Sequence, residues 1–385
     1  MIYCDWAATT PICEAAKEII METLDLYGNP SSNHWAGVTA RNLIENARAK
    51  IARCINAEPD EIFFTSGGSE ANTWMTSFDR VGFSLISPLE HHSMLGLAYN
   101  ELVDSDGIVN LAVMREILDD DVDTCGTEFD DYLLQLRKYE SVSCMYVNNE
   151  LGTIQPIKKI VEIAHKTGRL FGTDAVQALG HIKVDVKDIG CDFLSASGHK
   201  FGAPKGIGFL YIKKDAQDEA YKMIQGGKQE MGMRGGTENT LGIVAMAEAL
   251  EYSVIMMDEH NQYVRRLRDY LLEQLMNIEG AHLNGSLFNR VDSNINIRFD
   301  GISGADLVSL CDVHGICISS GSACNEGVPK PSHVLKAIGL SDEEALSSVR
   351  ITLGYKNTME EMKQVADVIR YSVQRLREAR NNETN

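Results

Sequence analysis

One lysine of the sequence directly follows an apolar run and stands among small and polar residues. The run Cys191–Ala196 leads into Ser197-Gly198-His199-Lys200, and a second run, Leu170–Thr173, ends in Asp174. In α/β sheets, ligands gather beyond the carboxyl ends of the strands, so two such strands would offer an amine and a carboxylate together. Pyridoxal phosphate (PLP) uses that pair: the lysine holds the cofactor, and the aspartate keeps its ring nitrogen protonated. Either residue alone is usually a solvated surface charge, so the case depends on the whole set.

A second pattern suits a phosphate group. Ile62–Thr65 is predicted to be a short buried strand that enters Ser66-Gly67-Gly68-Ser69, and a helix is predicted from Ala71 onward. Free backbone N–H groups and the helix dipole at such a start bind phosphate, although Gly-Gly more often marks a plain turn. Ser197 and His199 are close enough to the lysine in the chain to bind the same phosphate.

Four more polar residues suit the same site. His91 follows a predicted strand and can stack on a flat ring, while Asn149 and Gln177 can bond the phenolic oxygen of the cofactor or the substrate. Arg350 begins the apolar run Arg350–Leu353, where a guanidinium can bind a substrate carboxylate through two hydrogen bonds. Each also has a purely structural alternative, as a core histidine, a turn cap or an ion pair.

The most unusual thiol is Cys324. It stands in Ser319-Ser320-Gly321-Ser322-Ala323-Cys324-Asn325-Glu326-Gly327, a stretch of small and polar residues, which predicts an exposed and mobile cysteine. By contrast, apolar runs surround Cys144, Cys191, Cys311 and Cys317, as is typical of buried, inert thiols. We therefore expect Cys324 to be reactive, provided that its surroundings lower its pKa.

Bulk properties restrict the function. The 385 residues allow a large core and about two domains, and the net charge of −19 disfavours direct binding to nucleic acid. The nine cysteines form no C-x-x-C pair, which disfavours a disulfide framework, and no residues suggest a metal site. Met1–Asp5 lacks the features of a signal peptide, and no apolar run approaches a membrane span, so we expect a cytoplasmic protein with no membrane partner.

The order of the predicted elements gives the fold class. Up to a long helix predicted over Thr240–Met276, strands alternate with helices, which indicates an α/β domain with a largely parallel sheet. Beyond residue 280, Ser293–Phe299 alternates like an antiparallel strand, which indicates a smaller α+β domain. We expect a large domain over residues 15–257 and a small domain formed by residues 1–14 and 258–385. The final helix should begin with a capping box of Thr358 and Glu361, and Asn381–Asn385 should be disordered.

Taken together, the motifs resemble the cysteine desulfurases of the NifS/IscS type, which belong to the class V aminotransferase group of PLP enzymes with fold type I. The likeness spans nearly the whole chain and keeps its order. Its motifs are Ala8-Thr9-Thr10-Pro11, Gly28-Asn29-Pro30-Ser31-Ser32, Phe64-Thr65-Ser66-Gly67, Glu90-His91, Val147-Asn148-Asn149-Glu150, Asp174-Ala175-Val176-Gln177, Ser197-Gly198-His199-Lys200, Gly232-Met233-Arg234, Ser320-Gly321-Ser322-Ala323-Cys324 and Arg350.

The resemblance implies a role for each candidate residue. Lys200 would carry PLP, Asp174 would pair with the pyridinium nitrogen, His91 would stack on the ring and Gln177 would bond the phenolic oxygen. The phosphate would be held by Gly68, Ser69, Ser197 and His199, with Thr237 supplied by the partner subunit of a homodimer. Asn149 and Arg350 would orient the substrate, L-cysteine, and Cys324 would accept its sulfur and pass it to an iron–sulfur scaffold or a sulfur carrier. The fold implied is a large domain with a mostly parallel seven-stranded sheet flanked by helices, plus the small domain.

Some residues depart from the family pattern. Gly68-Ser69 replaces the usual Ala-Thr, Gln225-Gly226-Gly227-Lys228 replaces His-Gly-Gly-Gly, and Asn325-Glu326 follows the cysteine in place of Thr-Ser. These changes affect the choice of acceptor and the behaviour of the loop more than the catalysis. Three alternatives stay open: a selenocysteine lyase, a class V aminotransferase, and a non-catalytic scaffold for iron–sulfur assembly.

Overall fold

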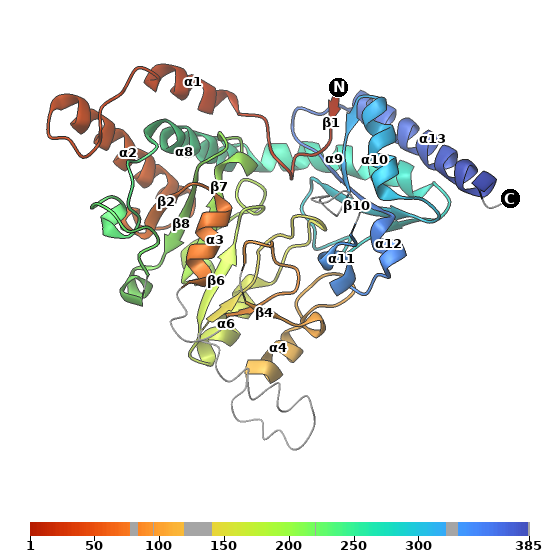
Figure 1. Ribbon diagram of the computed structural model, residues 1–385, viewed down its shortest axis with the longest axis horizontal. Helices are drawn as coiled ribbons and strands as arrows, with labels where there is room; N and C mark the ends of the chain where they lie inside the picture. Colours follow the sequence, from red (N-terminus) through yellow and green to blue (C-terminus); the bar gives the residue numbers. More distant parts are fainter. Residues whose placement is uncertain (78–83, 95, 119–140, 220, 321–329, 384–385) are drawn as a thin grey trace.

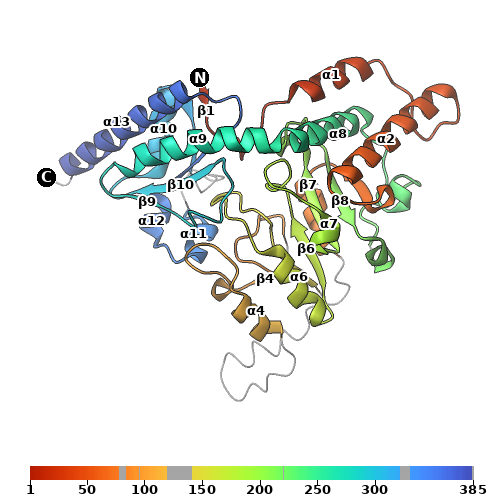
Figure 2. The same cartoon turned by 180° about the vertical axis from the view of Figure 1, so that it is seen from behind.

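The structure is a computed structural model, and it describes residues 1–77, 84–94, 96–118, 141–219, 221–320 and 330–383. Figures 1 and 2 show two lobes that are bridged by consecutive helices, α8 (Thr240–Ile255) and α9 (Met257–Met276). Both chain ends lie at the lobe that contains α9 (Figure 1).

The first lobe is organised around one mixed sheet. Its described strands number seven, and all are parallel except β8, which pairs antiparallel with both β2 and β7. In spatial order they are β2 (Ile62–Thr65), β8 (Gly208–Ile212), β7 (Phe193–Ser197), β6 (Leu170–Asp174), β5 (Ser141–Ser143), β3 (Ser84–Ile86) and β4 (Leu97–Ala98). The predicted α/β fold class with a mostly parallel sheet is thereby confirmed.

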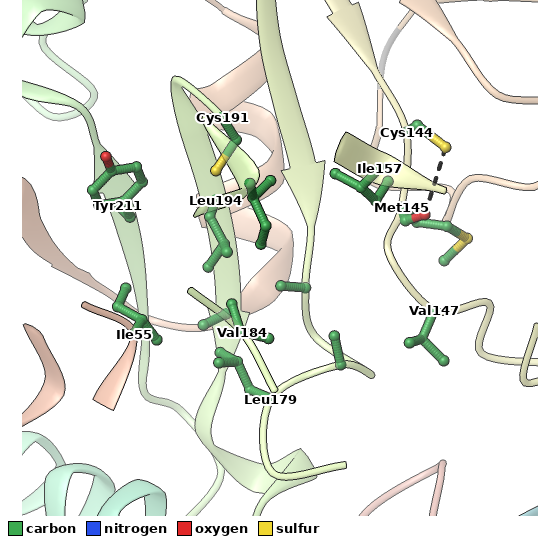
Figure 3. Packing of buried hydrophobic residues seen from close by; sticks show 14 of the residues in the cluster. Ile55, Cys144, Met145, Val147, Ile157, Leu179, Val184, Cys191, Leu194 and Tyr211 are labelled. Carbon is green, nitrogen blue, oxygen red and sulfur yellow. Dashed lines mark hydrogen bonds between the residues drawn. The ribbon is translucent and has the colours of Figure 1, made fainter. Parts of the chain in front are cut away.

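Alternate residues of the strands enter two different cores. Phe63 and Leu210 pack on one face of the sheet with Trp74 of α3 (Gly68–Thr76). Phe64 and Phe209 belong to a larger cluster on the other face. That cluster includes α2 (Trp35–Cys54), α6 (Ile157–Lys166) and α8, and Figure 3 shows part of it around β7. Strands that are buried on both faces read as continuous apolar runs, as these do.

Shorter helices complete the first lobe. They are α1 (Glu14–Thr23), α4 (Leu111–Leu118) and α7 (Val186–Ile189). Among them, α1 packs along α8, on the side of the lobe where α2 also lies (Figure 1).

The second lobe contains an antiparallel sheet and its own core. The sheet order is β12 (Ser319–Ser320), β13 (Ser348–Thr352), β10 (Asn294–Phe299) and β9 (Ala281–Leu283). The N-terminal strand β1 (Ile2–Tyr3) pairs with β11 (Ile316–Cys317), so the start of the chain belongs to this lobe. Its helices are α10 (Gly304–Val313), α11 (His333–Ala337), α12 (Asp342–Leu346) and α13 (Met359–Glu383).

The two largest hydrophobic clusters mostly follow the two lobes, and Cys4 belongs to the second cluster. Several residues of the second lobe nevertheless pack into the first cluster, among them Val291, Val334 and Ala345. The predicted division into residues 15–257 on one side and 1–14 with 258–385 on the other stays a prediction.

Two local expectations differ from the structure. The helix predicted over Thr240–Met276 is two helices bent by 68°, because α8 follows the first core and α9 the second. Helix α13 continues to Glu383, past the start of the predicted tail. Its predicted capping box is confirmed, because Glu361 N–H donates to Thr358 Oγ1 and Thr358 N–H donates to Glu361 Oε2.

Membrane spans were sought among the described helices. None of them alone is long and apolar enough to cross a membrane, and only the bent pair α8–α9 meets the criterion, by length and composition.

Candidate active site

Four neighbouring parallel strands carry polar residues just beyond their carboxyl ends. β3 leads to His91, β5 to Asn149, β6 ends in Asp174, and β7 runs into Lys200. These side chains line one pocket of about 790 Å³. It is lined by Ala7, Ala8, Gly68, Ser69, Asn72, His91, Ser93, Met145, Asn149, Asp174, Val176, Gln177, Ser197, His199, Lys200 and Arg350. The structure thus brings together every candidate named above except Thr237 and Cys324.

The amine of Lys200 is held by the N-terminal loop. Its Nζ donates to the carbonyls of Ala7 at 2.7 Å and Ala8 at 2.9 Å. Gln177 Nε2 also donates to the Ala7 carbonyl, at 2.9 Å. Burial, followed by the positive charge of Arg350, lowers the pKa of Lys200 to about 8. Near neutral pH a substantial fraction of the amine is therefore neutral, as a nucleophile or a base requires.

Asp174 is buried, and two hydrogen bonds hold its carboxylate. Its Oδ1 accepts from Val176 N–H at 2.8 Å, and its Oδ2 accepts from Asn72 Nδ2 at 2.7 Å. Burial raises the pKa of Asp174, although both hydrogen bonds act in the opposite direction. No cation among the described residues forms a salt bridge with it, so the protonated ring nitrogen of PLP fits this carboxylate.

The opposite end of the pocket suits a phosphate. Helix α3 begins at Gly68, where the first N–H groups have no partner within the helix. The loop before it packs closely on β8: a Cβ at Gly208 would lie 2.8 Å from Gly67 Cα. Within the described residues, no side-chain or backbone group bonds the hydroxyls of Ser69 and Ser197, which leaves them available to a ligand.

His199 lies at the same end and is a neutral group. Its Nδ1 lies 3.1 Å from Thr9 Oγ1. Burial, together with the charges of Lys200 and Lys205, lowers the pKa of His199 to about 4. It would therefore meet a phosphate as a hydrogen-bonding imidazole and not as a cation.

Arg350 reaches the pocket from the second lobe. Its Nη2 pairs with Asp5 Oδ1 at 2.9 Å, and its Nη1 donates to the Asn149 carbonyl at 2.9 Å. Its Nε is buried without a hydrogen-bond partner. A buried donor without a partner costs free energy, so a carboxylate that occupies the pocket would be bound favourably here.

Several residues of the site were not predicted from the sequence. Asn72 bonds Asp174 from α3, and Ala7, Ala8 and Asp5 hold Lys200 and Arg350 from the N-terminal loop. A signal for Asn72 did exist. It is a polar residue on the otherwise buried face of α3, where its neighbours are Ala71 and Met75.

Two predicted site residues are not in this pocket. Thr237 is exposed and lies beside another pocket, which Glu230 and Arg234 also line. Cys324 lies outside the described residues.

The thiols expected to be inert are mostly buried. Burial raises the pKa of Cys144, Cys191 and Cys311, the last to about 12, so all three are thiols at neutral pH. Figure 3 shows Cys144 and Cys191 among apolar side chains, with the Cys144 thiol donating to the Met145 carbonyl. Cys317, on strand β11, is instead partly exposed.

Comparisons with known proteins agree with this geometry. The family model for class-V aminotransferases matches residues 2–365. The cysteine desulfurase IscS of Dictyoglomus turgidum is 40% identical over 387 residues, which cover 98% of this chain and 95% of that protein.

Solved structures give the same result. A NifS-like protein from Rickettsia africae has a TM-score of 0.84 at 30% identity, with 97% of this chain and 99% of that chain covered. The structure of SspA in complex with cysteine has a TM-score of 0.76 at 30% identity, with 93% and 100% covered. The chain therefore belongs to the class-V aminotransferase family and, within it, to the cysteine desulfurases of the NifS/IscS type.

Proposed function

We propose that this PLP-dependent cysteine desulfurase removes the sulfur of L-cysteine, releases L-alanine and carries the sulfur on Cys324 to an acceptor protein. One observation carries the proposal: a single pocket holds the Lys200 amine, the Asp174 carboxylate, which forms no salt bridge within the described residues, and the Nε of Arg350, which has no hydrogen-bond partner among them. A solved relative whose chain this one covers completely is described as a complex with cysteine.

Different residues of the pocket would bind the cofactor and the substrate. Lys200, Asp174, Gln177 and His91 would hold the cofactor ring, and Gly68, Ser69, Ser197 and His199 its phosphate. When bound, PLP supplies an electron sink that stabilises negative charge at the substrate Cα. Arg350 binds the substrate carboxylate, and the side-chain amide of Asn149, which has no partner among the described residues, bonds the substrate beside it.

Lys200 then acts as the base. Its amine, with a pKa of about 8, takes the proton from the substrate Cα. The Cys324 thiolate attacks the substrate sulfur, so that an S–S bond forms while the C–S bond breaks and its electron pair stays with carbon. Protonation of that carbon and return of a proton from Lys200 to Cα give L-alanine, and the persulfide on Cys324 is ready for transfer to an iron–sulfur scaffold or a sulfur carrier.

The test compares two cysteines of the same chain. The purified, PLP-loaded protein should form alanine from L-cysteine in the presence of a reducing thiol. Cys324→Ala should reduce alanine formation by at least about 100-fold and keep the cofactor absorbance, because the nucleophile is lost while the pocket is intact. Cys317→Ala, seven residues away, is the control and should retain the wild-type rate.

Other outcomes would change the assignment. Full alanine formation by Cys324→Ala would contradict the role of Cys324. If the Cys324→Ala variant kept its activity on selenocysteine alone, the selenocysteine lyase alternative would gain support. Protein that binds no PLP would instead favour the scaffold alternative.

A homodimer is part of this proposal. Thr237 is exposed and lies away from the pocket of its own chain, so a second copy is needed to bring it to the phosphate end. The side chains of Tyr27 and Trp35 are also exposed, at 89% and 75%, as is typical of a surface that a partner covers. Light scattering should give twice the chain mass, whereas a monomer with full PLP affinity would contradict this role of Thr237.

A further inference from the structure

A continuous chain of hydrogen bonds joins the pocket histidine to the buried aspartate. His91 Nδ1 lies 2.7 Å from Ser93 Oγ, and Ser93 Oγ lies 2.9 Å from Asn72 Nδ2. The same Asn72 Nδ2 lies 2.7 Å from Asp174 Oδ2. Two residues to which no role has been assigned, Asn72 and Ser93, thus connect the two groups that flank the cofactor site.

The direction of each bond can be worked out from Asn72. Its amide nitrogen has two N–H groups, and both are used, one toward Asp174 and one toward Ser93. Its oxygen accepts the hydroxyl of Ser195. A flipped amide would place Oδ1 against the Asp174 carboxylate, which is also an acceptor, so the orientation of Asn72 is fixed. Ser93 Oγ is therefore an acceptor from Asn72.

The Ser93 hydroxyl has a single proton, which it donates to His91 Nδ1. Because His91 Nδ1 accepts from the backbone N–H of Ser93, it has no proton to donate, and the Ser93 O–H must therefore donate to it. The backbone N–H of Ser93 donates to the same atom at 3.1 Å. Nδ1 accepts twice and carries no proton, so a neutral His91 must hold its proton on Nε2.

The ring is also kept neutral and open to the pocket. Desolvation lowers the pKa of His91, and the charges of His92 and Lys200 lower it further against the opposing effect of Asp174. Within the described residues, Nε2 has no hydrogen-bond partner, and the side chain lines the pocket.

We propose that Asn72 and Ser93 are positioning residues that hold His91 as the Nε2–H tautomer, so that His91 presents a hydrogen-bond donor, and not a base, to the pocket. The inference rests on the proposed function for the use of that donor, which is to bond the substrate sulfur while Cys324 attacks it. It leaves Lys200 as the base of the site. The Nε2–H tautomer itself depends only on hydrogen bonds within the chain, so it is expected without any ligand.

The test is made first on the cofactor-free chain labelled with 15N-histidine. The chain has ten histidines, so His91 is assigned by the signals that disappear in His91→Gln. The 15N shifts at neutral pH should show an unprotonated Nδ1 and a protonated Nε2. In Ser93→Ala the tautomer should become mixed and the pKa of His91 should rise, because a donor to the unprotonated Nδ1 is lost. Ser93→Thr keeps the hydroxyl and should restore the wild-type spectrum.

A matched control separates this role from packing. Ser87 is buried, and its hydroxyl oxygen accepts from a backbone N–H on the same turn, so Ser87→Ala should leave the His91 signals unchanged. A protonated Nδ1 in the wild type, or an unaltered tautomer in Ser93→Ala, would overturn the inference. Because these readouts need no substrate, they can fail while the desulfurase activity stands, and the reverse also holds.

Discussion

Two cavities of this protein share Lys200 and differ in almost everything else. The cofactor pocket, of about 790 Å³, is lined mainly by residues with polar side chains, and some of their polar atoms have no partner in the described structure. The second cavity, of about 570 Å³, lies where α8, α9 and the N-terminal loop meet. Its rings contact one another: His260 stacks on Tyr355 at 4.2 Å, and Trp6 and Tyr252 lie 5.5 Å and 6.4 Å from the same ring.

The difference concerns which groups still lack a partner. In the aromatic cavity, the rings pack against one another, and the burial of their apolar surface stabilises the contact between the lobes. In the polar pocket, the buried Arg350 Nε has no hydrogen-bond partner among the described residues, and the buried Asp174 carboxylate accepts two hydrogen bonds but pairs with no cation there. Such groups cost stability and can be satisfied by a ligand, so the polar pocket is the functional one. Substitutions should therefore separate activity from stability.

The largest expected effect is on substrate binding. Arg350→Gln should raise the KM for L-cysteine by about 100-fold, because it removes one partner of a buried, charged hydrogen bond worth about 2–5 kcal/mol. Steady-state alanine formation measures this directly. Arg298→Gln is the matched control, since Arg298 lies on the neighbouring strand β10 and pairs with Glu344 outside the pocket. An equal rise in KM for both variants would remove the special role of Arg350.

Glu150, a buried carboxyl beside the polar pocket, should lower the free energy of unfolding when it is ionised. Burial raises the pKa of Glu150 to about 7, and its Oε2 accepts from Ser332 at 2.6 Å. Its usual pKa lies lower, so the folded state favours the protonated form, and stability falls as the pH rises from that usual value to about 7 and then levels off. Glu150→Gln should remove this loss. The difference in free energy of unfolding between the variant and the wild type should therefore shift in favour of the variant by up to about 3 kcal/mol from pH 5 to pH 8.

Denaturant unfolding of Glu150→Gln and wild type at the two pH values tests the sign. If the stability of Glu150→Gln relative to the wild type were the same at pH 8 and pH 5, the Glu150 carboxyl would be well solvated or paired. Ser332→Ala removes the hydroxyl that donates to Glu150. The loss of stability between pH 5 and pH 8 should then be larger than in the wild type.

The smallest effect should come from the aromatic cavity and should appear in stability alone. Tyr355→Ala should destabilise the protein by about 2 kcal/mol, because the stack on His260 and the contact with Trp6 are lost. Thermal unfolding measures this change, and the KM for L-cysteine should stay within about twofold. Tyr355→Phe keeps the ring and should match the wild type. A KM that rises as strongly as in Arg350→Gln would contradict the separation of the two cavities.

Much of the site could be predicted because it follows local sequence patterns. Each apolar run ends in a polar residue, and parallel strands place those ends at one edge, which is how Asp174 and Lys200 were found. The carbonyl groups of Ala7 and Ala8 gave no such signal, because a backbone contact across more than 190 residues depends on the fold and not on the side chain. The bend at Met256 was missed for a similar reason: two separate cores, and not a proline or glycine, set it.

The central claim is that Lys200 is the residue that binds the cofactor in the polar pocket. It is tested most directly by loading the protein with PLP, reducing it with borohydride and locating the modified lysine by mass spectrometry. The account predicts one modified residue, Lys200, with labelling that falls by about tenfold for each pH unit below its pKa of about 8. Modification of Lys205, or a label spread over several surface lysines, would contradict it.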